Sequence, residues 1–242
     1  MAGAEAMVND SGTLYGVGVG PGDPELMTVK AWRLISSAPV VAYLAANGKD
    51  STARDIAKPF IPAEAEHLVI DMPMRVEREP GERAYDAGAA AIAAHLSAGR
   101  NVVMLCEGDP FFYGSFMYVF ARLAAQHPCV VVPGVTSITA AAASLRRPLS
   151  ARNEVVKVLP ATLPEDRLRE ELMTAESAAI IKVGRHLPKL RNILGMLDLS
   201  GAAHVIIKAT HQDEVVKPLL DITEDTLPYF ATVLVYTGQE SW

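Results

Sequence analysis

Cysteine is scarce in this chain of 242 residues, since only Cys106 and Cys129 are present, far apart in the sequence. Two such thiols exclude a thiol-ligated zinc site and a disulfide framework, and we expect both to be small core residues. The six histidines show no metal-binding spacing such as H-E-x-x-H. We therefore expect no protein-bound metal.

Long apolar runs and a surplus of basic residues are also missing. No run approaches the roughly 18 apolar residues that cross a bilayer, and residues 1–10 place no basic residue before an apolar stretch, as a secretory signal would. We expect no membrane contact and a cytoplasmic location. With 22 Lys+Arg against 28 Asp+Glu the net charge is −6, which disfavours nucleic-acid binding because phosphates are neutralised by clustered basic residues.

Apolar sequence is plentiful, because 50% of the residues are hydrophobic, and this argues for one large or two modest folded domains. Short β-branched runs alternate with helical stretches, the pattern of α/β layers around a largely parallel sheet. One series predicts strands at 13–19, 40–44, 67–71, 101–106 and 129–132, with helices at 28–37, 52–58, 79–97 and 115–126. A second predicts strands at 154–159, 178–183, 204–208 and 230–236, with helices at 136–145, 164–174 and 187–197. We expect two α/β domains of similar size, 1–134 and 135–242, with 1–11 as a flexible extension.

The first predicted strand leads into a glycine-rich loop and a helix, G-V-G-V-G-P-G-D-P-E-L-M-T-V-K-A at 16–31. Glycines let the backbone turn with positive φ and let a ligand approach closely, and a helix start presents free N–H groups. As a dinucleotide-binding loop the segment fits badly, because Pro21 and Pro24 interrupt it and no acidic residue ends the next strand. A tight turn packed on its own sheet is the alternative.

Two further loops follow predicted strands. The segment C-E-G-D-P-F-F-Y-G-S at 106–115 surrounds Asp109 with aromatic residues, so its carboxylate could bind hydroxyl or amino groups while the rings pack on a flat heterocycle. An Asp-Pro turn followed by core aromatics is the other interpretation. In P-G-V-T-S at 133–137, Thr136 and Ser137 cap a helix or bind a ligand. Because ligands of open α/β sheets bind beyond the carboxyl ends of the strands, three such loops favour a binding site.

Taken together, the motifs at 18–31, 107–114 and 131–143 resemble those of the tetrapyrrole methylases, the S-adenosylmethionine-dependent family that methylates corrin precursors and uroporphyrinogen III. The resemblance spans residues 13–235. Within the family the chain is most similar to the branch that methylates C20 of precorrin-2. The stretches that carry this finer similarity lie at 51–57, 107–123, 180–191 and 208–216.

The resemblance implies two α/β domains with the cofactor in the cleft between them, usually in a homodimer. It implies methyl transfer from S-adenosyl-L-methionine, with S-adenosyl-L-homocysteine as product, to C20 of precorrin-2 or its cobalt-containing counterpart in cobalamin (vitamin B12) biosynthesis. Ten positions would contact the cofactor: Pro21, Glu107, Gly108, Asp109, Phe112, Thr136, Ser137, Val183, Ala209 and Thr210. Gly22, Asp23, Tyr113 and Arg185 are the substrate-side candidates.

In the implied reaction a meso carbon of the macrocycle displaces the methyl group from a sulfonium, so the protein has mainly to align the reactants. A base could take up the released proton, and Asp23, Asp71, Glu107, Asp109 and Tyr113 stay open for that role. Because the substrate is rich in carboxylates and the chain is acidic, binding requires a locally basic site. The candidates are Arg75, Arg78, Arg83, Arg146, Arg147, Arg152, Lys182, Arg185 and Lys208. For each of them, a solvated surface charge with no role in binding is the alternative.

Three other functions stay open at this point. One is a corrin or uroporphyrinogen III methyltransferase with a different target carbon, and another is a non-catalytic nucleotide-binding module. The third, a nicotinamide-dependent dehydrogenase, is disfavoured by the prolines of the first loop and the missing acidic residue. Metal-free and cobalt-containing substrates both stay open, because both pathways use similar proteins.

Overall fold

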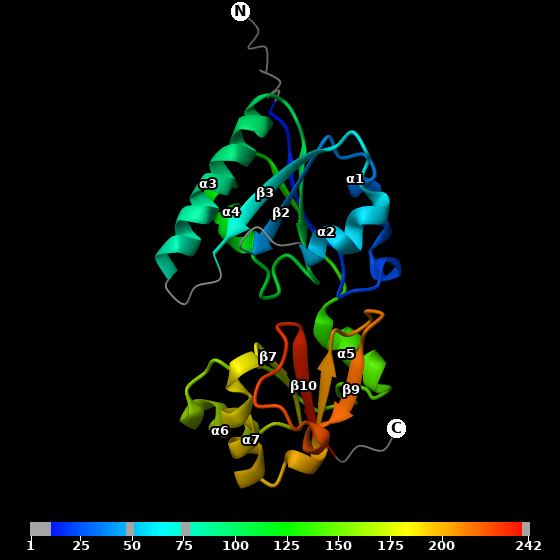
Figure 1. The fold of residues 1–242 in the computed structure, drawn as a ribbon, viewed down its shortest axis with the longest axis vertical. Helices are drawn as coiled ribbons and strands as arrows, with labels where there is room; N and C mark the ends of the chain where they lie inside the picture. The colour runs from blue at the N-terminus through cyan, green and yellow to red at the C-terminus, as the bar shows by residue number, and fades with distance from the viewer. Residues whose placement is uncertain (1–10, 47–50, 74–77, 239–242) are drawn as a thin grey trace, which may run out of the picture. The chain divides into compact units, whose positions relative to one another are not determined.

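The computed structural model describes residues 11–46, 51–73 and 78–238, with Arg78 described by its backbone alone. The chain divides into two compact units, of which unit 1 ends at Val135 and unit 2 begins at Thr136. Each unit has its own five-stranded sheet with helices beside it (Figure 1). Of the extension predicted over 1–11, all but Ser11 lies outside the described residues, and the Ser11 hydroxyl lies 3.4 Å from the Leu96 carbonyl oxygen.

The sheet of unit 1 is parallel throughout, in the order β3-β2-β4-β1-β5. Because β1 lies between β4 and β5, the loops that follow these three strands leave the sheet side by side. The elements are β1 (Leu14–Gly18), η1 (Pro24–Leu26), α1 (Val29–Ile35), β2 (Val40–Ala46), α2 (Thr52–Ala57), η2 (Lys58–Phe60), β3 (Glu66–Met72), α3 (Arg78–Ser97), β4 (Val102–Cys106), α4 (Phe116–Leu123) and β5 (Cys129–Val132).

Helices cover both faces of this sheet, as the near-continuous apolar strands require. Successive strand residues point to opposite faces: Val103 packs in the cluster that holds α1 and α2, whereas Val102 packs in the cluster that holds α3 and α4. Figure 1 shows α1 and α2 on one side of the strands and α3 and α4 on the other. The two cores hold the strands in place, so the positions of the loops at the carboxyl edge are set by the sheet.

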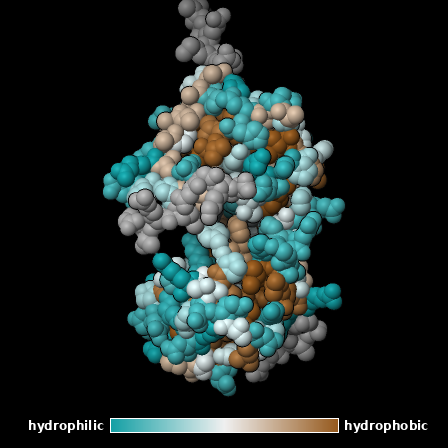
Figure 2. Space-filling view, in the orientation of Figure 1, coloured by the Kyte–Doolittle hydropathy of each residue, from teal (hydrophilic) through white to brown (hydrophobic). Residues whose placement is uncertain are grey.

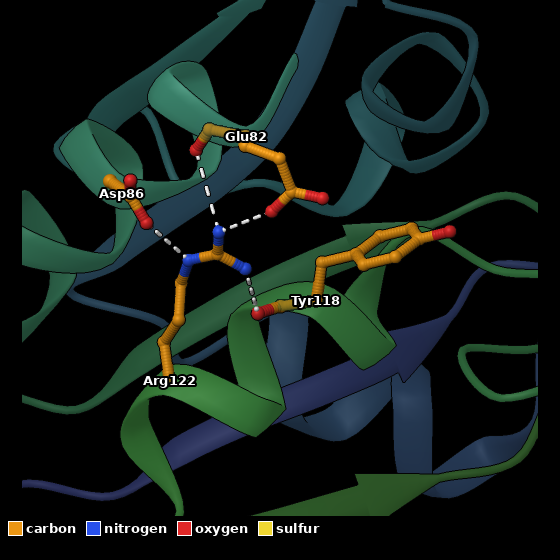
Figure 3. Close-up of polar contacts among 4 residues, drawn as sticks. All are labelled: Glu82, Asp86, Tyr118 and Arg122. Atoms are coloured by element: carbon orange, nitrogen blue, oxygen red, sulfur yellow. Dashed lines mark hydrogen bonds and ion pairs between the residues drawn. The ribbon is translucent and has the colours of Figure 1, made fainter. Parts of the chain in front are cut away.

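A polar clamp joins α3 to α4 at the surface of unit 1 (Figure 3). The Arg122 guanidinium donates to the Asp86 carboxylate at 2.7 Å, to the Glu82 carboxylate at 2.7 Å and to the Tyr118 carbonyl at 2.9 Å. These two carboxylates hold the pKa of Arg122 above its ordinary value. The same guanidinium lies 5.7 Å from the centre of the Tyr85 ring, so one side chain links two turns of α3 to α4.

The sheet of unit 2 is mixed, in the order β6-β7-β10-β8-β9. Only β6 and β7 pair in parallel, because β10 runs antiparallel between β7 and β8, and β9 returns from β8 as a hairpin. The expectation of a largely parallel sheet is wrong for this unit. The elements are α5 (Ser137–Leu145), β6 (Val156–Pro160), α6 (Glu165–Met173), β7 (Ser177–Ile181), η3 (Gly184–His186), α7 (Leu187–Met196), η4 (Ser200–Ala202), β8 (Ala203–Ile207), β9 (Val215–Pro218), η5 (Leu219–Asp221) and β10 (Ala231–Tyr236).

Among the described strands, β9 is the one that the sequence did not predict. It has four residues, V-V-K-P, and its burial never exceeds an intermediate level. Such a short edge strand, ending in proline, carries little periodicity. It exists because the antiparallel pairing Ile207↔Val215 closes a seven-residue loop over 208–214.

One face of the second sheet packs on α6 and α7, and the other packs on α5. On the face shown in Figure 2, apolar residues are interspersed among hydrophilic ones on both units, which is ordinary for a folded chain. Across the described ranges, no helix combines the length and apolar character that a membrane span needs.

Candidate functional site

Four glycine backbones meet where the loops after β1, β4 and β5 leave the sheet of unit 1. Gly20 and Gly108 form an antiparallel bridge, in which the Gly108 N–H donates to the Gly20 carbonyl at 2.8 Å. Both residues have positive φ, 84° and 61°. A Cβ on Gly134 would lie 2.0 Å from the Gly108 carbonyl oxygen, and one on Gly18 would lie 2.4 Å from it. Glycine is therefore required here for close packing of backbone on backbone.

The Asp109 carboxylate fastens the second loop to the third. Its Oδ1 accepts from the Phe111 and Phe112 N–H groups at 2.9 and 3.1 Å, which closes an Asp-Pro turn, and its Oδ2 accepts from the Gly134 N–H at 3.0 Å. The structure shows the Asp-Pro turn that one interpretation of the sequence predicts, and it adds a hydrogen bond between two loops that neither interpretation contains.

Glu107 connects the same loop to α2. Its Oε1 accepts from the Ala53 N–H at 3.2 Å, beside the Ser51 side chain that caps the helix. The side chain still reaches solvent, while the protein that surrounds it on its other sides removes hydration and raises its pKa. Glu107 thus combines solvent access with a carboxyl that binds a proton more tightly than usual.

In the first loop, Asp23 caps the short helix η1 by accepting from the Glu25 N–H at 2.9 Å. Gly22 is buried, whereas Pro21 and Asp23 are partly exposed. The sequence thus correctly predicts that the chain turns in this loop. The roles of Pro21, Gly22 and Asp23 in ligand binding stay predictions.

Aromatic side chains of the second loop lie open to solvent. Phe111, Phe112 and Tyr113 have exposed fractions of 47%, 36% and 45%, which contradicts the interpretation that they are core residues. Tyr113 is held at a φ of 56°, a conformation that costs free energy for a bulky residue and is concentrated at functional sites. Its ring packs edge-on against Phe112 at 5.3 Å, so the loop presents flat apolar surface.

The third motif continues into unit 2, where Thr136 is the N-cap of α5. Its Oγ1 accepts from the Thr139 N–H at 3.5 Å and lies 3.1 Å from the Thr139 hydroxyl. Ser137, the first residue of the helix, is exposed. The capping interpretation of Thr136 is therefore confirmed, and Ser137 keeps a hydroxyl at the surface.

The turn after β7 holds the next predicted residues. Lys182 and Gly184 have positive φ on either side of Val183, whose side chain is fully buried in the core of unit 2. Val183 is 0% exposed as a whole residue, and its contact with the cofactor stays a prediction. Arg185 is exposed, and the described part of the chain offers its guanidinium neither a hydrogen bond nor an ion pair. Lost hydration, and the charges of Lys189 and Arg185, lower the pKa of His186, so this turn is locally basic.

The loop between β8 and β9 carries Ala209 and Thr210. Ala209 is buried against α5, and Thr210 has a φ of 69°. The carboxylate of Glu214 accepts from the Thr210 N–H and from the Ser144 hydroxyl, each at 2.5 Å. Glu214 and Ser144 are not among the residues predicted from the sequence. The signal available was an acidic residue directly before a short β-branched run in the stretch at 208–216.

The remaining basic candidates differ in their surroundings. Lys208 forms an ion pair with Asp213, and Arg83 pairs with Glu79 at 3.1 Å. The Arg147 guanidinium stacks on the Tyr236 ring at 4.1 Å. Arg75 and the side chain of Arg78 lie outside the described residues. Within the described ranges, no group of three or more His, Cys, Asp or Glu residues could hold a metal ion.

Comparison with known sequences finds a family and several relatives. The family model for Tetrapyrrole (Corrin/Porphyrin) Methylases matches residues 13–221. The chain is 43% identical to the cobalamin biosynthesis protein CobIJ of Mycobacterium tuberculosis, over 94% of this chain and 46% of that protein, so it spans about half the length of this relative. It is 38% identical to a precorrin-2 C(20)-methyltransferase of Sinorhizobium, over 93% of this chain and 95% of that protein. It is 29% identical to a cobalt-precorrin-2 C(20)-methyltransferase of Salmonella typhimurium, over 93% and 96%.

Solved structures share the fold. The X-ray structure of the cobalt precorrin-4 methyltransferase CbiF matches with a TM-score of 0.73 and 25% identity, over 93% of this chain and 94% of that one. The uroporphyrin-III C-methyltransferase of Thermus thermophilus, complexed with S-adenosyl homocysteine, matches with a TM-score of 0.67 and 25% identity, over 93% and 92%. The prediction of two α/β domains of similar size is confirmed.

Proposed function

This chain belongs to the tetrapyrrole (corrin/porphyrin) methylases, and we propose that it methylates C20 of precorrin-2, or of cobalt-precorrin-2, with S-adenosyl-L-methionine in cobalamin biosynthesis. The observation that carries the proposal is its similarity to two relatives named C(20)-methyltransferases along 95% and 96% of their lengths. A corrin methyltransferase with another target carbon is the second candidate, favoured by the likeness to CbiF.

The residues of both units fit the chemistry of the cofactor. The solvent-accessible Glu107 carboxylate can accept from ribose hydroxyls or an ammonium group, and the open Phe112 ring can pack on a purine. Gly108 lets a ligand reach the backbone, while Val183 and Ala209, whose side chains are buried, would contribute main-chain groups. We propose these residues, with Pro21, Asp109, Thr136, Ser137 and Thr210, as the cofactor contacts.

When bound, S-adenosylmethionine supplies a methyl group made electrophilic by its sulfonium sulfur. In the transfer the S–CH3 bond breaks, a bond from C20 to the methyl carbon forms, and a proton leaves the macrocycle. The task of this chain is to align the reactants and to accept that proton. Among the candidate bases, Asp23, Asp109 and Glu107 each accept from at least one backbone amide, and Glu107 adds solvent access and a raised pKa. We propose Glu107 for the proton.

The substrate carboxylates need cations that are not already paired. Arg185 meets this condition within the described residues, and its planar guanidinium can pair with a carboxylate through two hydrogen bonds. Gly22, Asp23 and Tyr113 complete the proposed substrate contacts. The family resemblance further implies a cytoplasmic location and a homodimer, and sedimentation of the purified protein tests the homodimer.

The decisive experiment supplies metal-free and cobalt-loaded precorrin-2 side by side with S-adenosylmethionine, and locates the new methyl group by mass spectrometry and NMR. Methylation at C20 of either substrate is the expected result. Methylation at another carbon would replace the proposal with the second candidate, and the substrate that turns over faster identifies the natural one. Binding of NAD without binding of S-adenosylmethionine would point instead to a dehydrogenase.

A further inference from the structure

We propose that Glu214 is a positioning residue that holds the Ala209–Thr210 turn for the cofactor. The inference rests on the proposed function, because it concerns how one of the proposed cofactor contacts is kept in place. Glu214 itself is not among the cofactor contacts, and its carboxylate points back into the loop that it ends.

The turn that Glu214 supports is strained. Within the seven-residue loop over 208–214, Lys208 and Thr210 both have positive φ, 51° and 69°. Left-handed backbone is unfavourable for residues other than glycine, and most of all for a β-branched residue such as threonine. Such a conformation persists only where surrounding contacts enforce it.

The contacts of Glu214 are suited to that task. One carboxylate oxygen accepts both from the Thr210 N–H and from the Ser144 hydroxyl, each at 2.5 Å. The first bond fixes the strained residue from inside its own loop, while the second ties the loop to α5. Hydrogen bonds to an ionised carboxylate are shorter and stronger than neutral ones, so an acidic residue serves here better than an amide.

The helix at the other end of this link carries further proposed cofactor contacts. Helix α5 begins at Ser137 with Thr136 as its cap, and Ala209 packs in the same cluster as Ile138 and Ala141. The Ala209–Thr210 turn is thus held to helix α5 by the apolar packing of Ala209 and by the hydrogen bond from Ser144 to Glu214.

The test compares Glu214→Ala and Glu214→Gln with wild type, and it measures the Kd of S-adenosylmethionine by calorimetry and the steady-state constants. Loss of a charged hydrogen-bond acceptor predicts a Kd increase of about tenfold for Glu214→Ala. A smaller increase is expected for Glu214→Gln, which keeps one oxygen. We expect the KM for S-adenosylmethionine to rise in parallel, while kcat at saturation and the KM for the tetrapyrrole change by less than about twofold.

Glu170→Ala, in the exposed face of α6, is the matched control and should bind as wild type does. Ser144→Ala should weaken cofactor binding in the same direction, and less than additively with Glu214→Ala, because both act through one oxygen. Wild-type affinity in both Glu214 variants, or an equal loss in the control, would overturn the inference while leaving the proposed function intact. A wild-type protein that does not bind S-adenosylmethionine would instead remove the proposed function and the inference with it.

Discussion

Asp109 and Gly134 join two loops of unit 1 through one hydrogen bond, in which the Gly134 N–H donates to Asp109 Oδ2 at 3.0 Å. The other carboxylate oxygen closes the turn that carries Phe111 and Phe112. The aspartate therefore sets the position of the exposed aromatic residues relative to the third loop. Its place between glycine and proline gives it a rigid backbone on one side and a flexible one on the other.

Asp109→Asn should weaken binding of S-adenosylmethionine by about tenfold and lower the free energy of unfolding by about 1–2 kcal/mol. An asparagine can present one oxygen, so either the turn or the bond to Gly134 is lost. Calorimetric titration and thermal unfolding measure the two effects. Undiminished cofactor binding in this variant would remove Asp109 from the site.

Gly134→Ala should abolish cofactor binding or prevent folding, because the new Cβ would lie 2.0 Å from the Gly108 carbonyl oxygen. Backbone has to move to admit it, which costs about 1–3 kcal/mol or more. Gly201→Ala is the control, since nothing lies within 4 Å of its Cβ position. Circular dichroism and calorimetry on both variants test the prediction, and equal behaviour of the two would contradict it.

Glu107→Gln should change the pH dependence of stability. Burial raises the pKa of Glu107 in the folded protein, so the native state binds this proton more tightly than the unfolded chain does. The group therefore stabilises the fold at pH below its ordinary pKa, and that contribution is lost as the pH rises through the raised value. Glutamine does not titrate and loses no such contribution, so the Tm of the variant should rise relative to that of wild type as the pH increases from about 4 through the raised pKa of Glu107. A Tm difference that shrinks over this range would show that the sign is wrong.

Arg185→Ala should raise the KM for the tetrapyrrole substrate about tenfold and leave the Kd of S-adenosylmethionine within about twofold, because a charged hydrogen bond to a substrate carboxylate is lost. Arg169→Ala, another exposed arginine of unit 2, should change neither constant. Steady-state kinetics and calorimetry separate the two. An unchanged KM would place Arg185 outside the substrate site.

Arg122→Ala should lower the free energy of unfolding by about 1–3 kcal/mol, because the Arg122 side chain is 23% exposed and its guanidinium bonds from α4 to two carboxylates of α3. Arg83→Ala breaks an ion pair within α3 whose partners are 69% and 79% exposed, and should cost less than about 0.5 kcal/mol. Urea unfolding of the two variants measures the difference. Similar losses would show that the clamp between the helices adds nothing.

Local sequence determined much of this protein. The alternation of apolar strands and helices predicts every strand and α-helix described in unit 1, and glycine-rich strand ends mark the three loops, because periodicity and turn chemistry are properties of neighbouring residues. Residues 107–109 and 136–137 are predicted as site residues because they lie in these loops. The order of the motifs along the chain was enough to indicate the family.

Tertiary structure decided the rest, because it concerns contacts between residues that are distant in sequence. The reversed direction of β10, the edge strand β9, the bond from Asp109 to Gly134 and the reach of Glu214 to Ser144 all join separate segments. The local sequence around a loop carboxylate does not show whether that carboxylate binds a ligand, a helix or a neighbouring turn. Only the packing of the sheets brings a particular donor within hydrogen-bonding distance, and that distance decides which role each carboxylate takes.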